Sequence, residues 1–132
     1  MELLSVSLGV YYGDFTVAAA SENLTASQGK ALTVLRRRPA AMRALAETMA
    51  CDASNMTGII DRLEKRGLVR REANASDRRV KNVVLTAEGE RVTDAIRAKM
   101  RTTHDGLDRL TDQDRDSLYS LLERVFLSQP DA

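Results

Sequence analysis

The chain has 132 residues, 43% of them apolar, and a formal net charge of +1, so it is long and apolar enough to form one globular domain. Its single cysteine excludes an intramolecular disulfide, as is usual in a reducing cytosol, and its single histidine excludes a histidine-based metal site or catalytic dyad within the chain. The N-terminus lacks the basic start of a signal peptide, and no run is expected to reach the about 20 apolar residues that cross a bilayer. We therefore expect a cytoplasmic protein that is not an enzyme and has no metal, cofactor or membrane partner.

Two helices are expected before Pro39. Glu2–Ala20 carries apolar side chains spread widely around a helix, which indicates burial on more than one side. After a break at Ser21–Leu24, Thr25 can cap a second helix that runs to about Arg37. The proline then ends this helix, since its ring cannot continue the hydrogen-bond ladder.

The next segment predicts two short helices joined by a turn. The first spans Met42–Met49, and the second follows Asp52, whose carboxylate can accept hydrogen bonds from the first backbone amides. Gly67 supplies the left-handed conformation that ends the second helix, and Leu68 can pack back on its last turn. The apolar face of the second helix, at helical spacing, consists of Ala53, Met56, Ile60 and Leu63.

The opposite face of that second helix carries small and polar side chains. They are Ser54, Asn55, Gly58, Asp61 and Arg62. Residues of this kind suit a surface that approaches base edges closely. A glycine in mid-helix costs about 1 kcal/mol against alanine, and either a close approach to DNA or close packing would explain Gly58.

A hairpin follows the glycine. Its strands are expected at about Leu68–Glu72 and Val80–Leu85, joined by Ala73–Arg79. Two short helices, a glycine and a basic hairpin in this order indicate a winged helix-turn-helix, which places one helix in the DNA major groove and a hairpin beside it. The expected fold class is therefore mainly α with a small β hairpin (α+β).

Two further helices complete the expected fold. Thr86 caps a long helix that carries Val92, Ile96 and Met100 at four-residue steps, and Thr111 starts the last helix. The apolar stripe of the last helix consists of Leu118, Leu121, Leu122, Val125 and Phe126.

The terminal helices carry more apolar surface than a domain of this size can easily hide. We expect residues 1–132 to form a single domain in which 1–24 and 102–132 are dimerisation helices and 25–101 form the winged module with its linking long helix. A symmetric dimer would set two recognition helices ~34–36 Å apart, which suits a palindromic DNA site. The alternative is that the terminal helices fold onto their own module.

Basic side chains are concentrated in one part of the chain. Residues 62–81 carry eight basic and three acidic side chains, whereas residues 102–132 carry three basic and seven acidic ones. A basic block on a helix end and a hairpin is typical of a surface that faces phosphates. The alternative, a charged face that is merely solvated, is weakened because the block coincides with the helix–glycine–hairpin pattern.

Two runs of the sequence resemble the MarR family of transcriptional regulators. LAETMACDASNMTGIIDRLEKRGLVRR (Leu45–Arg71) resembles the second and third helices of that family, and SDRRVKNVVLTAEG (Ser76–Gly89) resembles its wing and the start of the following helix. The resemblance extends over about residues 28–101. It implies a homodimer on a pseudo-palindromic double-stranded DNA site, usually a repressor of nearby genes, and in many members a small, often phenolic effector.

The resemblance also assigns roles to individual residues. Those expected to face the major groove or its phosphates are Ser54, Asn55, Thr57, Gly58 and Arg62. The amide of Asn55 can pair with an adenine edge. At the wing, Arg78 and Arg79 would reach the minor groove, and Asp77 would position an arginine by an ion pair.

Three more basic residues are candidate phosphate contacts. They are Lys65, Arg70 and Arg71. The last two alternate along a strand, so at most one of them is expected to point at DNA.

Other residues have plain alternatives beside a functional interpretation. Cys51 is expected to be packed and inert rather than a redox sensor. Tyr11 and Tyr12 could line an effector pocket or belong to the core or the dimer interface. For the whole protein, the alternative to a DNA-binding regulator is a protein-interaction module, such as an antirepressor, on the same fold.

Overall fold

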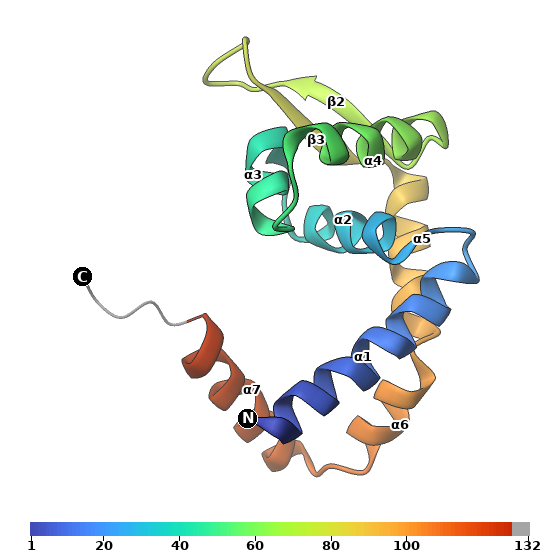
Figure 1. The fold of residues 1–132 in the computed structure, drawn as a ribbon, viewed down its shortest axis with the longest axis vertical. Coiled ribbons are helices and arrows are strands. Elements are labelled where there is room, and N and C mark those ends of the chain that lie inside the picture. Colours follow the sequence, from blue (N-terminus) through green and yellow to red (C-terminus); the bar gives the residue numbers. More distant parts are fainter. Residues whose placement is uncertain (128–132) are drawn as a thin grey trace. The chain divides into compact units, whose positions relative to one another are not determined.

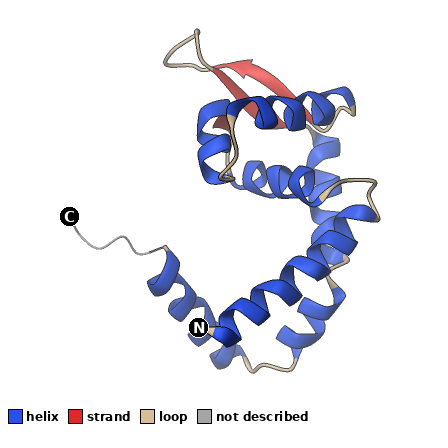
Figure 2. Cartoon of the chain, in the orientation of Figure 1, coloured by secondary structure: helices blue, strands red, loops and turns tan. Residues whose placement is uncertain are grey.

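The computed structural model describes residues 1–127, which form two compact units, one of residues 1–100 and one that begins at residue 101. The first unit contains α1 (Glu2–Ala20), α2 (Ala26–Arg37), β1 (Ala40–Ala41), α3 (Met42–Thr48), α4 (Ala53–Lys65), β2 (Val69–Ala73), β3 (Lys81–Leu85) and α5 (Ala87–Ala98) (Figure 1). The second contains α6 (Arg101–Asp108) and α7 (Asp112–Phe126). Helices dominate both units (Figure 2), which confirms the expected mainly α fold with a small sheet.

The sheet is antiparallel and has the strand order β1-β3-β2. The hairpin pairs Val69 with Leu85 and Ala73 with Lys81, so its predicted strands are correct to within one residue at each end. The sequence missed β1, in which Ala40 pairs with Val83. Two alanines after a proline carry no strand periodicity, and only the distant strand β3 makes them extended.

The core of the first unit surrounds α4. Its side chains Met56, Ile60 and Leu63 are fully buried, and they belong to one cluster with residues of α2, α5 and β3. The predicted apolar face was wrong at one position, because Ala53 is exposed and Ile59 is buried in its place. Ala53 is the first residue of the helix and precedes the turn that reaches the core.

The predicted caps are present at four helices. The hydroxyls of Thr25, Thr86 and Thr111 each accept a hydrogen bond from the backbone amide three residues on, and Asp52 does the same through its carboxylate. Each cap satisfies an amide that has no partner inside its helix. The helix starts are therefore fixed locally, by single polar side chains.

The long helix predicted to run through Met100 is interrupted. Helix α5 ends at Ala98, and α6 begins at Arg101. At the break, the ammonium of Lys99 lies 2.8 Å from the Glu22 carboxylate, and the side chain of Met100 is buried in the core of the first unit. These long-range contacts are invisible to local periodicity, which is why the prediction of one continuous helix was wrong.

Helix α1 combines a buried end with an exposed apolar one. Phe15, Ala18 and Ala19 are buried, whereas Leu3 and Val6 are 79% and 58% exposed. An 18-residue window of α1 has a mean hydropathy of 1.3, so by length and composition alone it could cross a membrane, and the expectation that no segment reaches that length was wrong. The core packing of its last turns instead makes α1 part of the protein interior at that end.

Gly89 allows α5 to start against the end of α4. The amide of Thr86 donates to the Leu68 carbonyl at 3.1 Å, and its hydroxyl donates to the Gly67 carbonyl at 2.6 Å. A Cβ atom on Gly89 would overlap that Leu68 carbonyl oxygen. Because this oxygen belongs to the backbone, it cannot move aside as a flexible side chain would.

We therefore predict that Gly89→Ala lowers the free energy of unfolding by about 1–3 kcal/mol, the usual cost of overpacking. The control is Gly58→Ala in α4, where an added Cβ would meet no atom within 4 Å. That variant should gain about 1 kcal/mol from helix propensity. Denaturant unfolding of both variants checks the prediction, and wild-type stability of Gly89→Ala would contradict it.

Candidate nucleic-acid interface

The outward face of α4 is polar and is held by a cap at its first turn. Asp52 accepts hydrogen bonds from the amide of Asn55 at 2.7 Å and from the hydroxyl of Ser54 at 2.8 Å. These bonds hold the pKa of the Asp52 carboxyl below its usual value, the backbone amide having the larger effect. The side-chain amide of Asn55 makes no hydrogen bond to any of residues 1–127, so its donors and acceptor are available to a ligand.

The remaining predicted residues of this face differ in exposure. Thr57, Arg62 and Lys65 are exposed, and Gly58 is half-buried. The Thr57 hydroxyl donates to the Ala53 carbonyl at 2.9 Å, which leaves its methyl group at the surface. Since a Cβ on Gly58 would meet no atom of the described chain within 4 Å, close packing does not account for this glycine.

The turn between β2 and β3, the wing, is closed by its own polar groups. The side-chain oxygen of Asn74 accepts hydrogen bonds from the backbone amides of Ser76 and Asp77, and the backbone amide of Asn74 donates to the Val80 carbonyl at 2.9 Å. Asp77 in turn accepts from both the amide and the guanidinium of Arg79, at 3.0 and 3.2 Å. The tip is thereby ordered around two carbonyl or carboxylate oxygens.

Two arginines project from this tip. The side chain of Arg79 is 92% exposed even though it is paired with Asp77. Arg78 is exposed as well and forms no ion pair with the described residues. The wing therefore presents two guanidinium groups to solvent, one of them oriented by a carboxylate.

Arg71 has a different environment from these two arginines. Its guanidinium lies 2.6 Å from Asp61 and 2.5 Å from Glu64, both on α4, and its side chain is only 25% exposed. The pKa of Arg71 is raised, mainly by the hydrogen bond to Asp61. Arg71 thus joins strand β2 to α4 and fixes the angle between the wing and the helix, which differs from the phosphate contact that the sequence suggested.

Arg70 and Arg66 are also engaged within the protein. Arg70 lies 2.6 Å from Glu72 on its own strand and remains half-exposed. Arg66, which the sequence analysis did not single out, donates to the carbonyls of Asn23 and Glu22 at 2.8 and 3.0 Å. It ties the end of α4 to the α1–α2 loop, more than 40 residues away in the chain, and no local pattern indicates such a contact.

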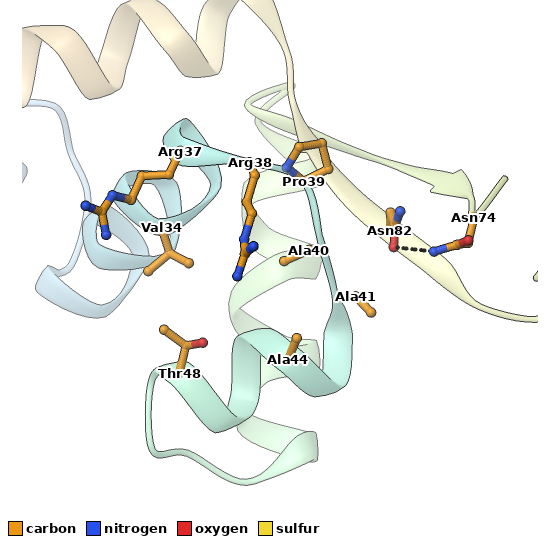
Figure 3. Close-up of a pocket in the computed structure, with 10 residues that line it drawn as sticks. All are labelled: Val34, Arg37, Arg38, Pro39, Ala40, Ala41, Ala44, Thr48, Asn74 and Asn82. Atoms are coloured by element: carbon orange, nitrogen blue, oxygen red, sulfur yellow. Dashed lines mark hydrogen bonds between the residues drawn. The ribbon is translucent and has the colours of Figure 1, made fainter. Parts of the chain in front are cut away.

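Helix α2 borders two pockets. One, of about 190 Å³, is lined by Tyr11, Tyr12, Phe15, Lys30, Thr33 and Val34. The other, of about 480 Å³, lies at the C-terminal end of α2 and includes Arg37 and Arg38 (Figure 3). Tyr11 and Tyr12 line the smaller pocket, and each is 45% exposed, so neither belongs to the buried core.

Two further features of the described residues concern metal binding and the single cysteine. Among the described residues, no three His, Cys, Asp or Glu side chains are grouped so as to hold a metal ion. Cys51 is half-buried and packs against the core cluster. It also borders a pocket of about 630 Å³ between α3 and α4.

The family model described as MarR family matches residues 24–81, from the end of the α1–α2 loop into β3. A putative transcriptional regulatory protein for the hcr operon of Thauera aromatica is 32% identical over 108 residues, or 80% of this chain. The chain belongs to the MarR family. The transcriptional regulator HosA of Escherichia coli is 35% identical over 83 residues. The matches cover 65% and 62% of these two regulators, less than two thirds of either.

Solved structures of MarR-like proteins extend the similarity to nearly the whole chain. CouR from Rhodococcus jostii RHA1, solved with p-coumaroyl-CoA bound, has a TM-score of 0.77 at 28% identity and covers 98% of this chain and 93% of its own. The apo form of MarR from E. coli has a TM-score of 0.76 at 23% identity, with 95% and 94% covered. Helices α1, α6 and α7, which lie outside the family match, therefore share the fold of these neighbours.

The cap of α4 gives a pH-dependent prediction. A carboxyl whose pKa is lowered in the folded protein stabilises it above its ordinary pKa, and this contribution is lost as the pH falls through the lowered value. Asp52→Ala should therefore be less stable than wild type at pH 7, and the difference should shrink on acidification below about pH 4.

Asp52→Asn serves as the control, because asparagine keeps a capping oxygen without a titrating proton. We expect it to retain more stability than Asp52→Ala at pH 7. Urea unfolding between pH 7 and pH 3 measures all three proteins. A gap between wild type and Asp52→Ala that stays constant over this range would contradict the assigned cap.

Proposed function

We propose that this MarR-family protein is a cytoplasmic, homodimeric regulator that binds double-stranded DNA at a specific site and represses nearby genes until a small aromatic effector binds. One observation carries the proposal. The outward face of α4 exposes the side-chain amide of Asn55 and the cations of Arg62 and Lys65, none of which has a partner among the described residues. The same unit presents two arginines on an ordered wing, which Arg71 ties to α4. That combination fits a major groove and the phosphates or minor groove beside it.

The proposed roles follow from the geometry of each side chain. Asn55 has a free amide at the first turn of α4, where it can pair with an adenine edge. Arg78 and Arg79 would enter the minor groove from the wing. Arg62 and Lys65, both exposed and without an ion pair among the described residues, are proposed phosphate contacts.

The terminal helices support the proposed dimer. Exposed apolar side chains are found on both of them: Leu3, Val6, Leu8, Val10 and Val17 on α1, and Leu118, Leu121, Leu122, Val125 and Phe126 on α7. Exposed apolar faces of this extent are typical of association surfaces. A two-fold axis through them would also present two copies of α4 to a palindromic site.

The effector is proposed to occupy the pocket between α1 and α2. Tyr11, Tyr12 and Phe15 provide aromatic walls, and Lys30 places its ammonium 6.0 Å from the Tyr12 ring centre. A flat aromatic group suits such walls. CouR, bound to p-coumaroyl-CoA, shows that a protein of this fold accepts an aromatic acyl ligand.

The first test is selection of bound duplexes from a random DNA library at ~150 mM salt, a condition under which non-specific binding is weak. We expect a two-fold symmetric site to be enriched. Repeating the selection with Asn55→Ala should relax the preference at one base pair in each half-site, at a cost of about 1–3 kcal/mol. If wild type enriches nothing, the protein-interaction alternative is favoured instead.

The salt dependence of DNA binding should distinguish arginines that contact DNA phosphates from arginines that are paired within the protein. Arg79→Ala should weaken binding and reduce the slope of log K against log salt by about 1 for each protomer, because the guanidinium of Arg79 is 92% exposed and stays accessible to DNA although it pairs with Asp77. Arg71→Ala should weaken binding at nearly unchanged slope, since its charge is already neutralised by Asp61 and Glu64. Fluorescence anisotropy at four salt concentrations distinguishes the two.

Arg91→Ala is the matched control for this experiment, because Arg91 lies on α5 and pairs with Glu88 at 2.7 Å. It should change neither the affinity nor the slope. A reduced slope for Arg71→Ala would show that Arg71 contacts a phosphate after all. An unchanged slope for Arg79→Ala would show that the tip of the wing contacts no phosphate.

Gly58 gives a prediction in which stability and binding move in opposite directions. Its substitution by alanine should stabilise α4, as argued above, yet the added methyl group would stand on the face proposed to approach the bases. We expect Gly58→Ala to be more stable and to bind its selected DNA at least several-fold more weakly. Equal affinity in the same anisotropy assay would show that the groove does not reach this turn.

A further inference from the structure

Helix α4 ends in a contact with a loop that is distant in the chain. The guanidinium of Arg66 donates one hydrogen bond to the Asn23 carbonyl at 2.8 Å and another to the Glu22 carbonyl at 3.0 Å. Two donors of one planar group that bind two successive carbonyls fix both the distance and the orientation of the partners. The end of α4 and the α1–α2 loop (residues 21–25) therefore cannot move separately without loss of these bonds.

The α1–α2 loop is in turn joined closely to the end of α1. The amide of Asn23 donates to the Ala20 carbonyl at 2.9 Å, and Asn23 adopts the left-handed conformation, with φ of +57°. This conformation is uncommon for residues other than glycine and persists where the surroundings hold it. The carboxylate of Glu22, only 15% exposed, also pairs with Lys99 just after α5. Movement of the last turn of α1 would therefore carry the carbonyls of the loop with it.

The cavity between α1 and α2 lies beside the same turns of α1. Phe15 lines this cavity and is otherwise buried, at 6% exposure. Gly29 of α2 packs so closely on α1 that a Cβ atom there would lie 3.1 Å from the Phe15 ring and 3.2 Å from the Cβ of Ala19. A close-packed interior has no space to absorb a shift. A ligand that displaces the Phe15 ring would therefore also displace the last turn of α1.

We propose that Arg66 couples the cavity between α1 and α2 to the DNA-reading helix. A ligand that displaces Phe15 moves the last turn of α1, and the paired hydrogen bonds of Arg66 transmit this movement to the C-terminal end of α4. The inference rests on the proposed effector response, and it adds the contact through which that response reaches the DNA-binding surface. A ligand shifts such an equilibrium only if it binds the two positions of α4 with different affinity, and Arg66 makes the position of α4 depend on the cavity.

Direct packing of α2 against α4 is the other route between the cavity and the DNA-reading helix. Leu32 and Leu35 of α2 belong to the same buried cluster as Met56 and Ile60 of α4. Apolar contacts are non-directional and allow one helix to slide along another, whereas the bonds of Arg66 weaken steeply when their angles change. Removal of Arg66 separates the two routes, because it leaves the apolar cluster intact.

A double-mutant cycle in the full-length protein tests the proposal, because two substitutions that act independently have additive effects. Gly29→Ala imitates a bound effector, since its Cβ presses on Phe15 and Ala19. Hydrogen–deuterium exchange of the amides of residues 62–68, without DNA, reports on the end of α4. We expect Gly29→Ala to change these exchange rates at least about threefold in the presence of Arg66, and less than about 1.5-fold in the Arg66→Ala background.

Three further variants control the cycle. Arg36→Ala removes an arginine that joins α2 to α5 through Asp94, at 3.3 Å, and it should leave the effect of Gly29→Ala unchanged. Arg66→Lys keeps a donor for the loop carbonyls and should restore part of the coupling. Thr33→Leu adds bulk from within the cavity and should reproduce the effect of Gly29→Ala, so the result does not depend on one substitution.

The same cycle, measured by anisotropy with the selected duplex, connects the contact to DNA binding. Gly29→Ala should weaken binding on the order of 3- to 10-fold when Arg66 is present, and less than about 1.5-fold in the Arg66→Ala background. Arg36→Ala should again leave the effect of Gly29→Ala unchanged.

Two outcomes would overturn the proposal. If Gly29→Ala has the same effect on exchange with and without Arg66, packing between α2 and α4 carries the signal and the role assigned to Arg66 is wrong. If neither Gly29→Ala nor Thr33→Leu changes the exchange of residues 62–68, the cavity is not coupled to α4. Because exchange is measured without DNA, a failed duplex selection with a sustained dependence on Arg66 removes only the regulator function. A successful selection with additive effects removes only the coupling.

Discussion

The complete burial of one face of α4 is the constraint on which the rest of the structure depends. Met56, Ile60 and Leu63 are inaccessible to solvent, and each contributes roughly 1.5–3 kcal/mol through its removal from water. Because this face is buried, α4 cannot rotate about its axis without exposing these three side chains to water. The polar side chains of the opposite face are therefore held outward, and the same apolar packing that stabilises the fold orients the proposed DNA-reading surface.

Hydrogen bonds and ion pairs fix the angle between α4 and its neighbours, which apolar packing alone leaves adjustable. Burial sets the rotation of α4 but only loosely its angle to neighbouring elements. Arg71 connects the helix to the wing, and Arg66 connects its end to the α1–α2 loop, next to the helix that lines the aromatic pocket. Arg66 donates to backbone carbonyls, and the carboxylates that pair with Arg71 are 59% and 42% exposed, so both contacts act mainly by positioning α4. A ligand bound between α1 and α2 would contact the two helices that the α1–α2 loop joins, and Arg66 at the end of α4 already binds this loop.

Local sequence signals predicted most of the elements, and long-range contacts account for the rest. The caps at Thr25, Asp52, Thr86 and Thr111 and the left-handed turn at Gly67, where φ is +73°, depend on residues within a few positions, so the sequence reveals them. Strand β1, the break before α6 and the partners of Arg71 depend on residues far along the chain. The pocket lined by Arg37 and Arg38 is of the second kind, since its lining joins α2, β1, α3 and two residues of the hairpin, Asn74 and Asn82.

The basic block of residues 62–81 illustrates why a charge count overstates a binding surface. Of its arginines, Arg66 and Arg71 are engaged by carbonyl or carboxylate oxygens inside the protein, and Arg70 has a partner on its own strand. The positive charge that this block offers to an outside anion is therefore smaller than its composition suggests. The exposed cations of the block that have no ion pair among the described residues include Arg62, Lys65 and Arg78, which lie on α4 and the wing.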